Sequence, residues 1–256
     1  MAKRLITAAI AVPLAIGVLL LDNSMVFMVA LTFFSAVAVY EMLIATKYIQ
    51  NKPIAIICIT FGAALIPLFS FEETKPYLPV VVFVFVTALF LVLLKSHDKI
   101  RFEEVAVMAF ISVCIPLALG TIAFFQMRYD DHGIFYIVFL LLSVWAGDAG
   151  AYFVGTLIGK HKMAPTISPK KSWEGFFGGI VVSGLTATAA CFVYMYIDYL
   201  MKGMNTFTIN IPYLVGLSLI CSVLGVFGDF TASIIKRQCS VKDFGNLLPR
   251  HGGVLD

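Results

Sequence analysis

Charged residues are scarce in this chain, because Asp, Glu, Lys and Arg make up only 13% of its 256 residues. A soluble domain has about 25% charged residues. The composition therefore indicates a protein that lies mostly within a lipid bilayer. The 5 cysteines include no Cys-x-x-Cys pair, and a disulfide framework or a zinc site therefore has no support. The net charge of +3 is too small to indicate nucleic-acid binding.

Apolar residues are abundant instead, at 61% of the chain with a mean hydropathy of +0.97. A membrane-spanning helix needs about 20 apolar residues, and none of the apolar runs alternates like a barrel strand. The sequence therefore predicts an all-α polytopic bundle of about eight spans, with the polar motif loops in the cytoplasm. The predicted spans are residues 5–21, 25–45, 54–71, 77–94, 105–126, 134–158, 175–200 and 211–235.

Basic residues are distributed unequally between the two sides that these spans define. Lys75, Arg128 and Lys202 fall on one side, and the remaining fifteen of the 18 Lys and Arg residues fall on the other. Cytoplasmic loops of membrane proteins carry an excess of Lys and Arg. The N-terminus and the basic loops are therefore predicted to be cytoplasmic. The first apolar run has no clear small-residue cleavage site, so it is predicted to be an uncleaved span.

Two aspartates lie within predicted spans, where an ionisable residue is costly and usually faces a cavity or a partner. Asp229 shares a helix face with Ser233 and Lys236, because they are spaced i, i+4 and i+7. Asp148 and Tyr152 form a similar stripe on the sixth span. Two interpretations stay open for Asp229: a catalytic or metal-binding role, or an intramembrane ion pair with a lysine.

The loop between the sixth and seventh spans is rich in groups that bind phosphate. Ser168 followed by Pro169 is typical of a helix N-cap with proline at the first helical position. A helix that starts there would direct free N–H groups at an anion. Lys160, Lys170 and Lys171 add positive charge, although contact with anionic lipid headgroups is an alternative for them.

Two glutamates have more than one interpretation. Glu174 either belongs to the same site or complements the N-terminus of the seventh span. Glu41 lies near the cytoplasmic end of the second span, where a structural carboxylate at the interface is favoured over a catalytic one.

A dense polar segment extends from the end of the last span to the last residue of the chain. It combines cations for phosphate, carboxylates for a metal and a glycine pair that allows a tight turn, as nucleotide chemistry at a membrane surface requires. The residues of this segment that we predict to act in a site are Lys236, Arg237, Lys242, Asp243, His251, Gly252, Gly253 and Asp256.

These motifs resemble those of the phosphatidate cytidylyltransferase family, also called CDP-diacylglycerol synthase. The C-terminal motif is carried by Ser233, Lys236, Arg237, Lys242, Asp243, Pro249, His251, Gly252, Gly253 and Asp256, and the upstream stretch runs from Asp148 to Gly175. The resemblance covers roughly residues 145–256, whereas the first half matches only as a set of hydrophobic spans. We therefore expect residues 1–130 to be N-terminal helices and residues 131–256 to form the catalytic region.

The resemblance implies an enzyme that joins CTP to phosphatidic acid, forming CDP-diacylglycerol and pyrophosphate with Mg²⁺ and a possible second cation. Asp229 and Asp256 would hold the metal. It also implies membrane lipids as partners, a bacterial inner (plasma) membrane location, a homodimer, and further residues after the point where this chain stops. Asp229, Lys236, Arg237, Lys242, Asp243 and His251 are the predicted catalytic residues. The predicted substrate-binding residues are Asp148, Tyr152, Lys160, Ser168, Lys170, Lys171, Glu174, Ser233, Gly252 and Gly253.

Two other functions are open on the sequence. A CTP-dependent polyprenol or lipid kinase would also need a basic cytosolic pocket but would release CDP rather than pyrophosphate. An ion-coupled transporter could use Asp148 and Asp229 as a relay and would need access from both faces. The unequal distribution of basic residues and the cationic motif loops favour the cytidylyltransferase.

Overall fold

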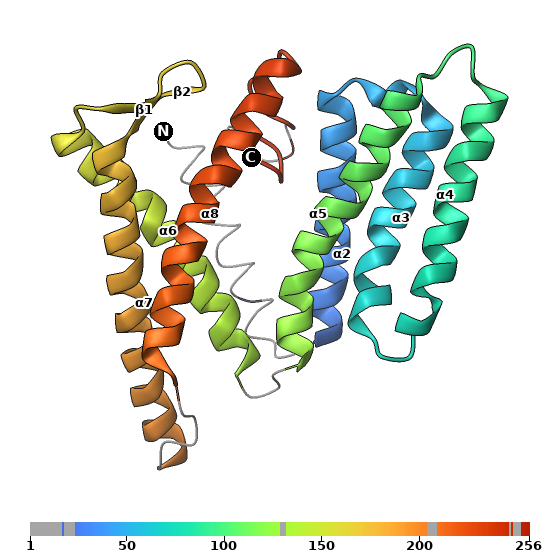
Figure 1. The fold of residues 1–256 in the computed structure, drawn as a ribbon. Coiled ribbons are helices and arrows are strands. Elements are labelled where there is room, and N and C mark those ends of the chain that lie inside the picture. The colour runs from blue at the N-terminus through green and yellow to red at the C-terminus, as the bar shows by residue number, and fades with distance from the viewer. Residues whose placement is uncertain (1–16, 18–23, 129–131, 204–208, 246, 248–251) are drawn as a thin grey trace. The chain divides into compact units, whose positions relative to one another are not determined.

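The computed structural model describes residues 17, 24–128, 132–203, 209–245, 247 and 252–256 (Figure 1). Within these residues, 7 helices are long and apolar enough to cross a membrane. They coincide with seven of the predicted spans, which confirms the all-α polytopic bundle. The first predicted span, at residues 5–21, lies outside the described residues except for Gly17.

The chain divides into two compact units. One comprises residues 1–134 and 239–256, and the other comprises residues 135–238. The expected division into an N-terminal helical region and a C-terminal catalytic region stays a prediction.

Among the described residues, the first unit contains four long helices, of which α3 packs against the other three (Figure 1). Short 3-10 turns at Tyr48–Gln50 and Lys75–Tyr77 precede the second and third of these helices. The helices are α2 (Ser24–Ala45), α3 (Lys52–Ser70), α4 (Leu78–Lys95) and α5 (Phe102–Arg128).

Small residues and aromatic stacking hold these helices together. The Ser35 hydroxyl of α2 donates a hydrogen bond to the carbonyl oxygen of Gly62 on α3 at 3.0 Å. Phe61 of α3 stacks on Phe85 of α4 with ring centroids 3.9 Å apart. The outward face of α4 is apolar, and Phe83 and Leu94 are each 71% exposed. Exposed side chains of this kind fit a helix surrounded by lipid.

The part of the second unit that the structure describes contains three long helices and a small hairpin (Figure 1). The hairpin joins the end of α6 to the start of α7, so it lies at one end of both helices. The elements are α6 (Gly133–Ile158), β1 (Lys162–Ala164), β2 (Ser168–Ser172), α7 (Trp173–Lys202) and α8 (Ile211–Gln238).

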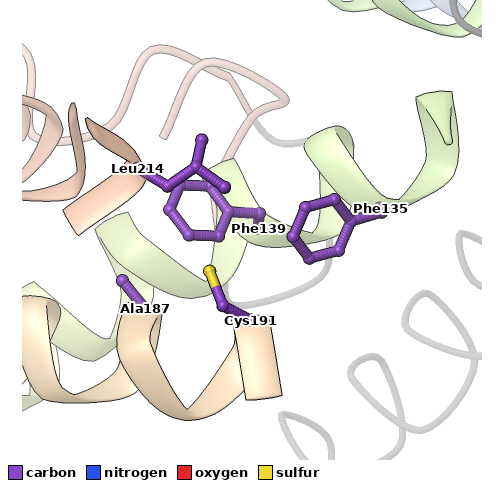
Figure 2. Packing of buried hydrophobic residues seen from close by; sticks show 5 residues of the cluster. All are labelled: Phe135, Phe139, Ala187, Cys191 and Leu214. Carbon is purple, nitrogen blue, oxygen red and sulfur yellow. The ribbon is translucent and has the colours of Figure 1, made fainter. Parts of the chain in front are cut away.

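A buried hydrophobic cluster joins the first turns of α6 and α8 to the middle of α7 (Figure 2). Phe135 and Phe139 come from α6, Ala187 and Cys191 from α7, and Leu214 from α8. The residues come from three different helices, so the cluster holds α6, α7 and α8 together away from the hairpin.

Glycines bring α6 and α7 into close contact nearer the hairpin. A Cβ atom at Gly179 would lie 2.6 Å from the carbonyl oxygen of Gly147, and one at Gly175 would lie 2.6 Å from that of Ala151. The buried Ser183 hydroxyl donates to the carbonyl oxygen of Ser143 at 2.8 Å. Small residues at a helix interface allow such close backbone approach in membranes, so these glycines set the distance between the two helices.

Replacing Gly179 with Leu is expected to destabilise the protein, because backbone atoms of α6 occupy the space that the side chain would need. Overpacking of this kind costs about 1–3 kcal/mol or more. Thermal unfolding of the purified protein in detergent measures the effect. Gly216→Leu is the matched control, since a Cβ at Gly216 meets nothing within 4 Å. Equal melting temperatures for the two variants would contradict the close contact of α6 with α7.

The predicted helix start at Ser168 is wrong. Ser168 begins strand β2, which pairs antiparallel with β1, so that Ala164 lies opposite Ser168 and Lys162 opposite Ser172. Helix α7 begins at Trp173, and the Ser172 hydroxyl caps it by accepting a hydrogen bond from the Gly175 N–H at 3.2 Å. A residue before proline favours extended backbone, and β1 supplies hydrogen bonds that a helix start at Ser168 would forgo.

Candidate functional site

A cavity of about 720 Å³ lies at the hairpin end of the second unit. Its volume falls within the range of about 300–1,000 Å³ that is common for small-molecule sites. Residues of α6, the hairpin, the first turns of α7 and the last part of α8 line it. It brings together six of the residues predicted from the sequence: Asp148, Tyr152, Ser168, Lys170, Lys171 and Asp229.

An ion pair at the wall of this cavity joins β2 to α8. The Nζ atom of Lys171 lies 2.5 Å from Oδ2 of Asp229 and also 4.7 Å from the centre of the Phe230 ring. Asp148 lines the same cavity as Lys171 and Asp229. Asp229 thus has a lysine as its partner, and its catalytic or metal-binding role stays a prediction.

The hairpin makes this cavity cationic. Lys170 and Lys171 come from β2, and Lys162 reaches the same lining from β1. From the sequence, Lys162 is one of the fifteen basic residues on the predicted cytoplasmic side, and only the pairing of β1 with β2 brings it to the site. The three lysines can offset part of the negative charge of a triphosphate or a lipid phosphate through charge-assisted hydrogen bonds.

Several predicted residues belong to the same unit but lie outside the lining of this cavity. The Glu174 carboxylate accepts a hydrogen bond from the backbone N–H of His161 at 3.2 Å, and its Oε1 lies 2.6 Å from Nδ1 of the His161 ring. It thereby closes the base of the hairpin, and its substrate-binding role stays a prediction. Lys160 follows the last residue of α6. The remaining predicted residues of this unit outside the lining lie on α8 and are Ser233, Lys236 and Arg237.

The C-terminal segment belongs to the other unit, with residues 1–134. One oxygen of Asp256, Oδ2, accepts hydrogen bonds from the backbone N–H groups of Phe244 at 2.7 Å and Gly253 at 2.9 Å. Gly252 has a φ of +106°, a conformation that glycine adopts without strain. The tight turn predicted at this glycine pair includes a residue outside the described range and stays a prediction. Lys242 and Asp243 are exposed on the same segment, and His251 lies outside the described residues.

Glu41 of α2 contacts this segment. It is only 3% exposed, and its Oε2 accepts a hydrogen bond from the Leu255 N–H at 3.1 Å. The sequence favoured a structural carboxylate at the interface, and the structure shows that its partner is the C-terminal motif segment. No spacing pattern could reveal this contact, because the two residues are 214 positions apart.

The described residues contain no cluster of three or more His, Cys, Asp or Glu side chains that could hold a metal ion. The cavity does contain the carboxylates of Asp148 and Asp229. Mg²⁺ is commonly held by one or two carboxylates together with substrate phosphates and water. The donor set of the cavity therefore fits Mg²⁺ that binds together with a phosphate-containing substrate.

Comparison with known proteins agrees with these features, since residues 2–256 match the cytidylyltransferase family. A phosphatidate cytidylyltransferase of Staphylococcus aureus (strain COL) is 31% identical over 260 residues, which cover 100% of this chain and 93% of that protein. The enzyme of that name from Bacillus subtilis (strain 168) is 32% identical over 262 residues, covering 100% and 91%. One from Haemophilus influenzae is 39% identical over 150 residues, covering 57% and 49%. The resemblance seen in the motifs is thus confirmed, and the chain belongs to the cytidylyltransferase family.

Proposed function

We propose that this membrane protein transfers the cytidylyl group of CTP to phosphatidic acid, forming CDP-diacylglycerol and releasing pyrophosphate. The observation that carries the proposal is a cavity lined by Lys162, Lys170 and Lys171 together with the carboxylates of Asp148 and Asp229. It occurs in a chain that aligns over its whole length with phosphatidate cytidylyltransferases. The same comparisons favour neither the lipid kinase nor the transporter.

In the proposed reaction a phosphate oxygen of phosphatidic acid attacks the α-phosphorus of CTP. A new O–P bond forms, the bond from the α-phosphorus to the bridging oxygen breaks, and pyrophosphate leaves with that electron pair. The substrate is itself the nucleophile, so no serine or cysteine nucleophile is needed. Both substrates are anions, and the main tasks of the protein are to neutralise charge and to hold the reacting groups in line.

The hairpin lysines are suited to the first of these tasks. Lys171 is held beside Asp229, so its ammonium group is already oriented before a substrate arrives. Lys162 and Lys170 extend the positive surface along the hairpin. We assign these three side chains to the phosphates of CTP and phosphatidic acid, which they would hold by charge-assisted hydrogen bonds.

A divalent cation, Mg²⁺, is the proposed cofactor, and Asp229 is the residue that we assign to hold it. When bound, such an ion neutralises phosphate oxygens and eases the departure of pyrophosphate. The metal-binding role of Asp256 stays a prediction, as do the number of ions and the homodimer.

The enzymatic test is incubation of the purified protein with CTP, phosphatidic acid and Mg²⁺. Equal amounts of pyrophosphate and CDP-diacylglycerol are expected, and neither product should form when phosphatidic acid is omitted. Release of CDP with a polyprenol substrate, and no pyrophosphate, would instead identify a lipid kinase. A protein that forms no product and moves ions across vesicles would be a transporter.

We further propose a bacterial inner-membrane location with the N-terminus and the hairpin in the cytoplasm. The positive-inside rule supports this orientation. In a cysteine-free background, Thr166→Cys at the exposed hairpin turn should react with an impermeant maleimide in inverted vesicles and stay unlabelled in intact cells. Glu73→Cys, in the exposed loop beside Lys75, should show the opposite pattern. Exchanged patterns would overturn the orientation.

A further inference from the structure

Glu41 is a buried carboxylate that no step of the proposed reaction uses. Its Oε2 atom binds the Leu255 N–H at 3.1 Å. Its Oε1 atom is buried and has no hydrogen-bond partner among the described residues. Carboxylates are almost never fully buried unless they are paired, and an unsatisfied buried oxygen is unfavourable. The position of this side chain therefore needs an explanation beyond packing.

Two glycines of the C-terminal segment make room for the Glu41 carboxylate. A Cβ atom at Gly245 would collide with Oε1, and one at Gly253 would collide with Oε2, both well inside the 3.0 Å that real Cβ contacts keep. Neither glycine has a positive φ. Space for the carboxylate, rather than an unusual backbone conformation, therefore explains the need for glycine at both positions.

The same segment is also tied together from within. Asp256 Oδ2 accepts hydrogen bonds from Phe244 and Gly253, and the Phe244 side chain is buried. Asp256 therefore stabilises the conformation of the segment, whereas Glu41 links the segment to α2. These contacts all lie within one compact unit.

We propose that Glu41 is a positioning residue, which anchors the motif segment of residues 239–256 to α2 by accepting the Leu255 N–H. The segment carries Lys242, Asp243 and Asp256, so its placement decides where those charges stand during cytidylyl transfer. Glu41 acts through this segment and does not itself contact a substrate. The catalytic part of the inference rests on the proposed function, whereas the anchoring part does not.

The kinetic test uses the full chain in detergent or lipid discs. Glu41→Ala should lower kcat by about tenfold or more, as loss of a hydrogen bond to a charged group predicts, with little change in the KM for CTP. Glu41→Gln should stay within about threefold of the parent protein, because its amide oxygen still accepts the N–H. Ser35→Ala is the matched control, since Ser35 is also buried on α2 but bonds to Gly62 of α3, and it should stay within the same range.

A second readout needs no activity. Cys239 is a half-buried free thiol at the start of the same segment, and burial raises the pKa of this thiol, so labelling is run at mildly alkaline pH. With the other four cysteines replaced by serine, Glu41→Ala should react with maleimide several-fold faster than the parent, because release of the segment exposes the thiol. Glu41→Gln and Ser35→Ala should react at the parent rate.

Gly245 provides an independent variant. Gly245→Ala should behave like Glu41→Ala in both assays, because the added methyl group displaces the carboxylate. In the double variant the two effects should not add, since both break one contact.

The outcomes separate the two proposals. Glu41→Ala with parental kcat and parental labelling would overturn the anchoring role, and so would an equal loss for Glu41→Gln. If the parent protein forms no CDP-diacylglycerol, the proposed function fails, and the labelling experiment still decides whether Glu41 holds the segment.

Discussion

Replacing Asp229 with Asn is expected to lower Mg²⁺-dependent CDP-diacylglycerol formation by roughly two orders of magnitude or more. The substitution keeps the size of the side chain but removes the charge that we assign to the cation. Its effect on stability should be small, because the Asp229 side chain is 53% exposed and its ion pair with Lys171 is therefore partly screened. Steady-state rates over a range of Mg²⁺ concentrations, with size-exclusion chromatography to check folding, measure both effects.

Asp198 supplies the matched control for this variant. It lies on α7 and pairs with Lys202, with Oδ1 and Nζ 3.4 Å apart, and it is not part of the cavity lining. Because it leaves the cavity lining unchanged, Asp198→Asn should retain the parental rate to within about threefold. Parental activity of Asp229→Asn would refute the metal assignment.

Replacing Lys171 with Met is expected to lower kcat/KM for CTP by about 100- to 1,000-fold, the range seen when a preorganised donor is removed. Lys171 is the cation beside Asp229, and Asp148 lines the same cavity. Without it, the two carboxylates would repel both each other and the incoming phosphates. Methionine keeps an unbranched apolar side chain that can still pack beside the Phe230 ring.

Two further variants test whether the effect arises from charge at this position. Lys171→Arg should recover part of the lost rate, because it keeps the charge but changes the geometry of the donors. Lys202→Met removes a lysine that also pairs with an aspartate of the same unit but does not line the cavity, and it should have parental kinetics. If Lys171→Met and Lys202→Met have the same kinetics, the assignment of Lys171 to the phosphates is wrong.

Sequence alone determined the spans and the helical stripes. A membrane helix satisfies its backbone hydrogen bonds within its own segment, so a run such as residues 211–235 specifies a helix without help from its neighbours. The i, i+4, i+7 spacing of Asp229, Ser233 and Lys236 follows from the same local geometry, and α8 contains all three. The motif resemblance likewise needed only the order of residues, and the family match confirmed it.

Tertiary structure decided the hairpin, because Ser168 and Ser172 are both able to cap a helix. Because β2 pairs with β1, Ser168 lies in a strand and Ser172 is the residue that caps α7. The same pairing brings Lys162 to the cavity. Strand pairing depends on a partner elsewhere in the chain, and so the local signal at Ser168 was misleading.

Contacts between distant segments also came only from the tertiary structure. Lys171 pairs with Asp229 because β2 and the end of α8 meet in one unit, and Glu41 reaches Leu255 across 214 positions. Spacing patterns report neighbours within a few turns of one helix. The partners of Asp229 and Glu41 depend instead on the packing of the helices. That packing brings segments together that are far apart in the sequence.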